Sequence, residues 1–462
     1  MTRLLQSCTY DRLLGALFFL VVVLACGLTP MQSDTWWQLR AGRDMWSARH
    51  VMLTDVYSHT AYGSFWLNHE WLAEILYYLA YRLGGLPAVT LLATALVTGA
   101  WAIVWSLTSA SSRAKFAWLV FALPAASGAW EPRPHAFSLL LLPLTVLVIV
   151  RQRYLWTLPI LFALWANLHG GVLIGLLVLS AGIGVRVFHD PGEWRRSARL
   201  LGACLAATCA TPIGWRFWIE IPRSLARIHQ YPLNEWRAPQ LADVGMLPFW
   251  VLAAAFVVTV AIRRRELARR PAEATLCAAA LLLLPLAIVA IRNTGPFVML
   301  AAPALATLVP FRLRASADSN RRQQAIHLIA IAGGAAAVLA TLAVAYTMRI
   351  GKLRWSPIPE SAIAALRQCP DNLYNRYDEG GSLIWFLPER RVFLDGRQDP
   401  FVPALVLEHL KMETSGLDYR EVFTRHNIRC AYLPSTSPTV PQLARAGWTT
   451  LYHDQGWVVL RQ

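Results

Sequence analysis

The feature that most constrains the fold is a series of long apolar runs separated by short arginine clusters. Eleven runs approach the length of about 20 residues that a helix needs to cross a bilayer. They lie at about 11–29, 86–109, 115–130, 136–150, 154–168, 171–188, 198–212, 247–262, 272–291, 296–310 and 325–347. Only 15% of the residues are charged, against about 25% in soluble domains. The pattern therefore predicts a mainly α, polytopic membrane helix bundle.

The arginine clusters predict an orientation. A net charge of +16 would suggest nucleic acid in a soluble protein, but here the charge is concentrated in short segments between apolar runs. With a cytoplasmic N-terminus, the inside segments, among them "RQR", "RRRELARR" and "FRLRASADSNRR", are all basic, as the positive-inside rule requires. We expect a protein of the bacterial cytoplasmic (inner) membrane with a retained first span and no nucleic-acid partner.

Two domains are expected: a membrane domain, 1–347, with a long first external loop at 30–86, and a periplasmic (extracytoplasmic) α/β domain, 348–462. In this tail the alternation predicts strands at "NLYNRY", "RRVFLDG", "IRCAYLP", "TTLYHD" and "WVVLRQ", and helices at "GGSLIWFL", "PALVLEHLKMET" and "YREVFTRHN". The pair Gly380-Gly381 is read as a turn. Cys369 and Cys430 both fall in the exported tail, where a disulfide is permitted, but their spacing does not decide whether they pair.

Cationic residues stand in turns on the predicted outer face. Ionisable groups at membrane depth carry a large free-energy penalty and usually face an interior cavity, so this distribution predicts a cavity open to that face. The turns "EPRPH", "NLHGG" and "IRNTG" supply Arg133, His135, His169 and Arg292. Such a set suits a phosphate or pyrophosphate group, although Pro and Gly in these turns also serve turn geometry alone.

The first external loop opens with an acid, Asp34, in "MQSDTWWQLRAGRDMW". Asp34 is either a reactive carboxylate or only the N-cap of the helix that follows, and the neighbouring tryptophans are typical interfacial anchors. Further along, "NHEWLAE" lacks the second histidine of HExxH because Ala73 occupies that position. We therefore expect no metal site, and no cofactor, since no nucleotide-binding motif is present either.

Carboxylates and cations beside a lipid-accessible cavity fit one reaction class. In the transfer of a sugar from a polyprenyl-phosphate carrier, arginine and histidine hold the phosphate leaving group, and a carboxylate removes the acceptor's proton. The carrier's lipid chain would enter from the bilayer. No nucleotide site is needed for this reaction.

Several phrases carry a family resemblance: "SDTWWQLRAGRDMW", "EPRPHAFSLLLL", "LWANLHGG" and "YNRYDEGGSLIWFLPERRVFLDGRQDPF". They resemble a group of bacterial multi-spanning proteins placed near the GT-C superfamily, whose integral-membrane glycosyltransferases use lipid-linked sugar donors. The resemblance implies that Asp34 is the catalytic acid of the first external loop, with Glu70 as the second acid and Asp55 as its rival. Many GT-C enzymes pair adjacent acids, whereas Ser33 and Thr35 flank Asp34 here, so we expect an inverting, metal-independent transfer.

The remaining site residues are assigned by the chemistry of their side chains. The donor phosphate is expected at His69, Arg133, His135, His169 and Arg292, and the acceptor, an envelope glycan, glycolipid or protein, at Trp37, Glu235, Asp395 and Arg397. Two alternatives stay open. A noncatalytic envelope-assembly factor would keep the fold without needing Asp34, and a transporter or flippase of lipid-linked saccharide would call for inverted repeats, which are not visible in the sequence.

Overall fold

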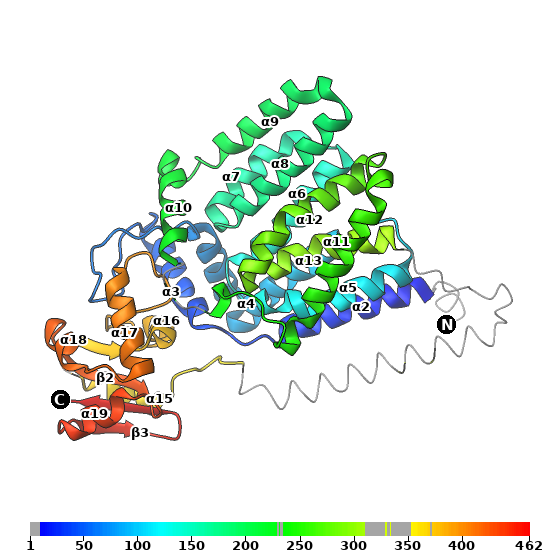
Figure 1. Cartoon of the computed structure of the whole chain (residues 1–462). Coiled ribbons are helices and arrows are strands. Elements are labelled where there is room, and N and C mark those ends of the chain that lie inside the picture. The colour runs from blue at the N-terminus through cyan, green and yellow to red at the C-terminus, as the bar shows by residue number, and fades with distance from the viewer. Residues whose placement is uncertain are drawn as a thin grey trace. The chain divides into compact units, whose positions relative to one another are not determined.

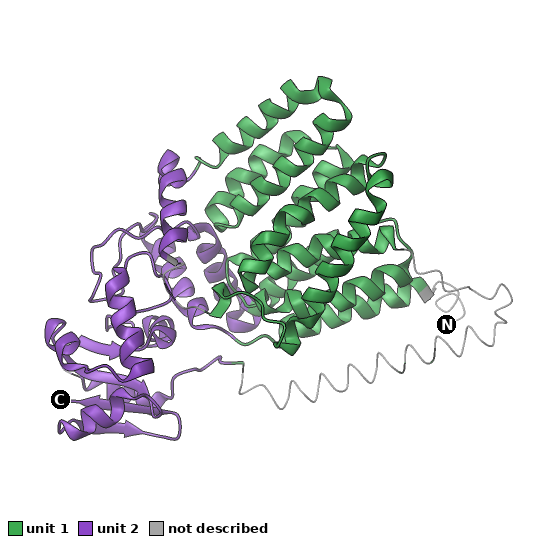
Figure 2. Cartoon of the chain, viewed as in Figure 1, with its two compact units in different colours: residues 1–30, 90–210, 233–353 green, residues 31–89, 211–232, 354–462 purple. Residues whose placement is uncertain are grey.

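The computed structural model describes residues 10–228, 231, 234–309, 329, 333, 353–369 and 372–462 (Figure 1). The chain divides into two compact units, each made of three separate segments (Figure 2). The membrane unit comprises 1–30, 90–210 and 233–353, and the loop–tail unit comprises 31–89, 211–232 and 354–462. The first external loop thus shares a unit with the tail.

The membrane unit is helical, and each of the first ten apolar runs contains a helix. These helices are α2 (Tyr10–Gly27), the second half of α4 (Trp71–Ser106), α5 (Ser112–Ala126), α6 (His135–Arg151), α7 (Leu158–Leu168), α8 (Val172–His189), α9 (Trp194–Ala207), α11 (Leu247–Leu267), α12 (Pro271–Val289) and α13 (Thr294–Leu308). The eleventh run, apart from residues 329 and 333, lies outside the described residues. Helix α13 is buried along almost its whole length and packs against α5, α11 and α12, so it forms the centre of this unit.

Four helical segments among the described residues are long and apolar enough to cross a membrane. They are Trp71–Ser106, Val172–His189, Val244–Leu267 and Pro271–Val289. Two shorter apolar segments are His135–Arg151 and Leu155–Leu168. The total of eleven spans therefore stays a prediction.

The loop–tail unit combines helices with one small sheet. Its helices are α3 (Ser33–Ala48), the first half of α4, α10 (Phe217–Ile228), α15 (Glu360–Arg367), α16 (Tyr377–Phe386), α17 (Pro403–Ser415), α18 (Arg420–Arg425) and α19 (Thr439–Arg445). The strands are β1 (Asn372–Asn375), β2 (Ile428–Pro434), β3 (Thr449–His453) and β4 (Trp457–Arg461), in the order β1-β2-β4-β3. Strands β1 and β2 are parallel, and the other pairs are antiparallel. The small α/β tail is thus as predicted in most of its elements.

One predicted strand, "RRVFLDG", is absent. In place of a strand partner, the side chain of Asn375 accepts a hydrogen bond from the Phe393 amide and donates one to the Leu394 carbonyl oxygen, both at 2.8 Å. The segment instead meets the first loop, because the Val392 amide donates to the Tyr57 carbonyl oxygen at 2.9 Å. The contact is a single isolated bridge between Val392 and Ser58. Sequence alternation could not identify this short pairing.

The pair Gly380-Gly381 lies inside α16 and is not a turn. A Cβ at Gly380 would lie 1.9 Å from the carbonyl oxygen of Leu394, and one at Gly381 would lie 2.2 Å from that of Ser33. Both positions therefore exclude any side chain. The two glycines let α16 approach α3 of the first loop closely.

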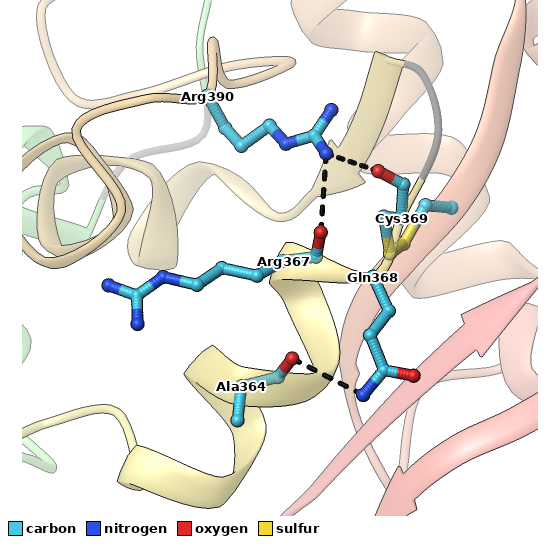
Figure 3. The surroundings of a disulfide bond; sticks show 6 residues. Ala364, Arg367, Gln368, Cys369 and Arg390 are labelled. Atoms are coloured by element: carbon cyan, nitrogen blue, oxygen red, sulfur yellow. Dashed lines mark hydrogen bonds between the residues drawn. A yellow bond between two sulfur atoms is a disulfide. The ribbon is translucent and has the colours of Figure 1, made fainter.

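Cys369 and Cys430 form a disulfide, with their Cα atoms 5.8 Å apart (Figure 3). The bond joins the segment after α15 to β2, and both residues are buried. Arg390 donates hydrogen bonds to the carbonyl oxygens of Arg367 and Cys369 beside it. The disulfide and Arg390 together hold α15 against the sheet.

Candidate functional site

Asp34 lies in the first turn of α3, where the positive end of the helix dipole favours a carboxylate. It is not the N-cap, since that position belongs to Gln32. The Trp37 indole Nε1 donates a hydrogen bond to Asp34 Oδ1 at 3.0 Å. On another side the carboxylate lies against Gly396, where an added Cβ would be only 1.9 Å from Oδ1. Asp34 is therefore held between its own helix and the loop 395–399 of the tail.

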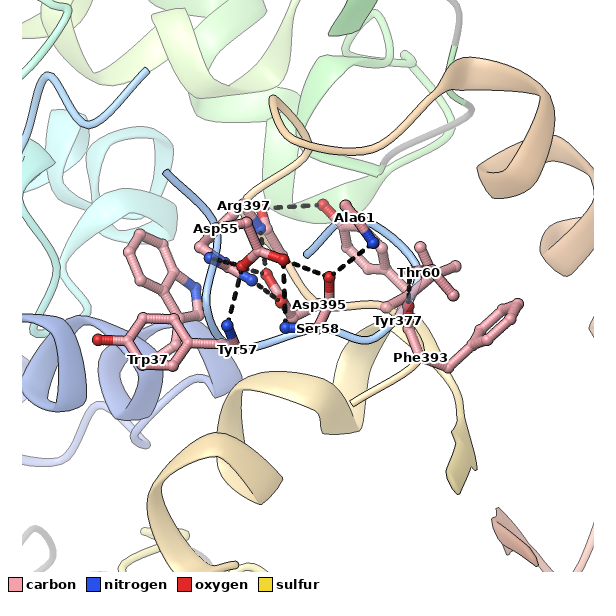
Figure 4. Close-up of polar contacts among 12 residues, drawn as sticks. Trp37, Asp55, Tyr57, Ser58, Thr60, Ala61, Tyr377, Phe393, Asp395 and Arg397 are labelled. Carbon is pink, nitrogen blue, oxygen red and sulfur yellow. Dashed lines mark hydrogen bonds and ion pairs between the residues drawn. The ribbon is translucent and has the colours of Figure 1, made fainter. Parts of the chain in front are cut away.

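That loop is fixed by a buried charge cluster of Asp55, Asp395 and Arg397, which we call the Arg397 cluster (Figure 4). Arg397 Nη1 lies 2.5 Å from Asp55 Oδ1, and Nε and Nη2 donate to the two oxygens of Asp395 at 2.8 and 2.6 Å. All three side chains have an exposed fraction of 0%. The guanidinium also lies over the rings of Trp66 and Tyr57, 4.9 and 5.1 Å from their centroids.

The electrostatics of the Arg397 cluster follow from burial and pairing. Burial raises the pKa of Asp395, and Arg397 opposes that shift. Burial lowers the pKa of Arg397, but Asp395 and Asp55 raise it by more, so the guanidinium stays charged. One cation thus compensates only part of the negative charge of the two carboxylates. The surrounding hydrogen bonds stabilise the remaining charge.

Asp55, which the sequence assigned to catalysis, and Asp395 and Arg397, which it assigned to acceptor binding, pair with one another in this cluster. Asp55, besides its ion pair, accepts hydrogen bonds from the backbone amides of Tyr57 and Ser58 at 3.1 and 3.2 Å and from the Ser58 hydroxyl. Asp395 and Arg397 have no exposed side-chain surface on which an acceptor could rest. Asp55 and Arg397 lie far apart in the sequence, so the spacing of residues does not reveal that they pair.

The second acid of the first loop, Glu70, lies beside His69, whose Nε2 is 3.7 Å from Glu70 Oε1. His69 also interacts electrostatically with Asp399, the last residue of the loop 395–399. Burial raises the pKa of Asp399, while His69 and a hydrogen bond from Ser224 of α10 lower it. The loop 395–399 therefore approaches Asp34 at Gly396, and His69 acts electrostatically on its last residue, Asp399. Ser224 carried no sequence signal, because its role depends on where α10 folds.

In the membrane unit, Glu235 bridges two arginines; we call Arg133, Glu235 and Arg292 the Glu235 cluster. Arg292 Nη1 donates to Glu235 Oε1 at 3.1 Å, and Arg133 Nη1 lies 3.8 Å from Oε2. Their side chains are 23–37% exposed. Burial raises the pKa of Glu235, but Arg292 and Arg133 lower it by more, so the pKa lies below its usual value. Arg292 also stacks over Trp236, 4.5 Å from the ring centroid.

His169 belongs to the same unit and has a defined tautomer. Its Nδ1 accepts hydrogen bonds from the Gly171 amide at 3.0 Å and from the Ser138 hydroxyl at 2.8 Å, and that hydroxyl accepts one from Trp165 Nε1 at 2.6 Å. In the neutral ring the proton is therefore on Nε2, which makes Nε2 a donor. The ring of His135 lies 6.3 Å from that of His169.

The motif "NLHGG" is explained by this arrangement. A Cβ at Gly171 would lie 2.4 Å from Ser138 Oγ and 2.8 Å from His169 Nδ1, so only glycine permits the hydrogen-bonded chain. Asn167 donates to the carbonyl oxygens of Ala163 and Ala210, both at 2.8 Å, and so joins α7 to the end of α9. The sequence identified the histidine but not Ser138 or Trp165, which look like ordinary residues of apolar helices.

The structure thus gathers Arg133, His135, His169 and Arg292 in the membrane unit, and Asp34, His69 and Glu70 around the tail loop of the other unit. Within the described ranges, no three His, Cys, Asp or Glu side chains are grouped as a metal site would need. Metal independence remains a prediction.

Solved structures from a bacterium and an archaeon are similar to this chain. ArnT from Cupriavidus metallidurans bound to undecaprenyl phosphate is 16% identical, with 97% of each chain covered and a TM-score of 0.56. The archaeal oligosaccharyltransferase AglB from Archaeoglobus fulgidus, in complex with an inhibitory peptide and a dolichol-phosphate, is 11% identical, with 91% of this chain and 69% of AglB covered and a TM-score of 0.57. No family model and no curated protein matches the chain.

These similarities establish the fold class. The chain has a GT-C-like fold, as the resemblance in its sequence implied. Together with its long apolar helices, the fold makes this a multi-pass membrane protein. At such low identity the likeness carries the architecture and leaves the substrate to be argued from the side chains.

Proposed function

We propose that this protein is a glycosyltransferase that moves a sugar from a polyprenyl-phosphate donor to an envelope glycan, glycolipid or protein at the outer face of the bacterial inner membrane. The transfer is inverting and metal-independent. The observation that carries the proposal is the Glu235 cluster, in which two guanidiniums share one carboxylate. ArnT bound to undecaprenyl phosphate and AglB in complex with dolichol-phosphate support the choice of donor class.

The donor phosphate is assigned to the cations of the membrane unit. Arg133 and Arg292 place two guanidiniums beside the single carboxylate of Glu235, and all three side chains are partly exposed, so an anion can approach the two cations. His169 adds the Nε2 donor that its tautomer fixes, and His135 lies next to it. These groups stabilise the negative charge that develops on the phosphate as it leaves. Glu235, which the sequence had suggested for the acceptor, then acts by holding the two arginines in place.

The acceptor is assigned to Asp34. In a single displacement, the acceptor oxygen forms a bond to the anomeric carbon while the bond from that carbon to the phosphate oxygen breaks, and Asp34 takes the acceptor's proton. The electron pair of the broken bond stays on the phosphate. Trp37 and Gly396 are positioning residues, because they fix the carboxylate of Asp34 on two sides. Glu70 is the second acid, with His69 Nε2 3.7 Å from its Oε1.

The Arg397 cluster receives a structural role in this proposal. Asp55 and Asp395 are buried and paired, so neither serves as a base, and Arg397 holds the loop that carries Gly396. The tail thereby becomes part of the support for Asp34. Acceptor contacts are left to groups around Asp34.

The test is mass spectrometry of envelope glycans and of polyprenyl-phosphate-linked sugars in a deletion strain complemented with wild type, Asp34→Asn or Asp44→Asn. Asp44 is the matched control, because it lies on the same helix and its carboxylate is engaged by Arg40 at 2.7 Å. We expect a lipid-linked sugar to accumulate, and a glycan to lose one residue, in the deletion and with Asp34→Asn but not with Asp44→Asn.

Restoration by Asp34→Asn at wild-type protein level would remove Asp34 from the mechanism. The noncatalytic assembly factor or the flippase would then be the better account. Equal failure of both variants, with both proteins folded and inserted, would also contradict the specific role of Asp34.

A further inference from the structure

A second feature of the membrane unit shares no residue with the Glu235 cluster. It is a groove of about 320 Å³ between α8, α11 and α12. Its walls are almost entirely apolar, and small residues, among them Gly184, Ala274 and Ala278, leave the space open. Phe188, which is 74% exposed, forms part of the rim. A volume of this size falls within the range of ligand sites in proteins, about 300–1,000 Å³.

The three helices that form the groove are among those apolar enough to cross a membrane. Since these helices are apolar enough to span a membrane, we expect the groove to meet lipid, and a flexible acyl chain is the ligand that such a wall accommodates. A soluble metabolite or a peptide would have to leave its polar groups without partners in that environment.

One end of the groove is cationic. Arg264 is part of the lining, and within the described part of the chain it has no carboxylate partner. The carboxylate nearest in sequence, Glu266, is shared by Arg263 and Arg270, both at 2.9 Å. The segment "RRRELARR" contains five arginines and a single acid, Glu266, so positive charge dominates this end.

His189, which also lines the groove, contacts two backbone carbonyl oxygens. The two ring nitrogens of His189 lie 2.8 and 3.1 Å from the carbonyl oxygens of Val185 and Ala268. His189 thus ties the last turn of α8 to the turn that joins α11 to α12. This contact joins two of the groove's lining residues, His189 and Ala268.

We propose that this groove binds an anionic phospholipid, with an acyl chain between α8, α11 and α12 and the phosphate on Arg264. An arginine at the end of a spanning helix reaches the head-group layer, and clustered basic residues there select anionic lipids. The site is independent of the sugar donor and of the proposed glycosyl transfer.

The test is native mass spectrometry of the full-length protein purified in detergent and offered phosphatidylglycerol or phosphatidylcholine. We expect retained phosphatidylglycerol to exceed phosphatidylcholine, and Arg264→Gln to lower its occupancy by about fivefold. Ala278→Phe, which fills the groove without changing charge, is expected to remove the bound lipid. Arg265→Gln is the matched control, since this neighbouring arginine is exposed but does not line the groove.

Equal loss in Arg264→Gln and Arg265→Gln would show diffuse attraction to basic residues and overturn the site. Equal retention of the two lipids, or unchanged binding in Ala278→Phe, would overturn it as well. Melting temperature and elution volume of each variant report whether it is folded, so a misfolded variant is replaced by Ala278→Leu at the same position.

Discussion

The Arg397 cluster and the Glu235 cluster have opposite compositions. The first places one guanidinium between two carboxylates, and the second places one carboxylate between two guanidiniums. The first has no exposed side-chain surface, whereas the side chains of the second are 23–37% exposed. Two similar sets of residues thus occupy very different environments in one chain.

The difference separates structural support from ligand binding. A fully buried charge set has to satisfy itself, because any uncompensated charge without water carries a large penalty. A partly exposed set can leave one charge for a ligand, since water stabilises that charge until the ligand arrives. Exposure, more than residue type, therefore tells which of the two clusters is suited to bind a phosphate.

The largest expected effect comes from breaking the buried cluster. Arg397→Gln leaves Asp55 and Asp395 buried without a cation, so we expect the free energy of unfolding to fall by about 3–5 kcal/mol. Thermal and denaturant unfolding of the purified protein measures it. Arg367→Gln, in an ion pair that is 60% and 44% exposed, is the control, with an expected change below about 1 kcal/mol. Similar stability losses in the two variants would contradict the structural role.

A smaller effect, on the rate of transfer instead of on stability, is expected from the Glu235 cluster. Arg292→Gln removes a charged donor to the phosphate, worth about 1.5–3 kcal/mol, so we expect transfer to slow by about 10- to 100-fold with little change in melting temperature. The rate of product formation in membranes from the complemented strain measures it. Arg237→Gln is the control, because Arg237 pairs with Asp243 in the same loop region at 2.5 Å. If Arg292→Gln lowered the melting temperature without slowing transfer, the Glu235 cluster would be structural support instead of a ligand site.

The smallest effect tests an intermediate case, Glu379 of α16. Arg376 Nε lies 3.5 Å from Glu379 Oε2, and the carboxyl side chain is 14% exposed. Burial raises the pKa of Glu379 from 4.5 to about 7, although Arg376 lowers it. The folded state then binds more protons than the unfolded state between these values, so the stability present below pH 4.5 is lost as pH rises through 7.

We expect most of this loss, on the order of 2 kcal/mol, to fall between pH 5 and 8, and Glu379→Gln to remove it. Melting temperatures of both proteins across that range measure the difference. Unchanged pH dependence in the variant would mean that Arg376 compensates the burial of Glu379 in full.

The sequence predicted what depends on local pattern. Apolar runs identified the helices of the membrane unit, and alternation identified all four strands of the tail. The cations of "EPRPH", "NLHGG" and "IRNTG" were recognised together because they stand in turns between such runs, and the structure gathers them in one unit.

What depends on distant contacts could not be predicted. Nothing near Asp55 in the sequence points to Arg397, and the glycines at 380, 381 and 396 are explained only by the backbone or carboxylate that each approaches. The missing strand at "RRVFLDG" has the same origin, since Asn375 takes over its hydrogen bonds. These are the positions where packing between separate segments overrides local preference.

The discontinuous loop–tail unit has a consequence for synthesis of the chain. Its first segment, 31–89, is made early, whereas the segment that supplies Arg397, Gly396 and the sheet, 354–462, is made last. Asp55 is therefore without its cation, Arg397, through nearly the whole of translation. A nascent chain that stops short of the tail leaves the charge of Asp55 uncompensated. Synthesis of the last segment is therefore the step that supplies the cation of Asp55 and completes this unit.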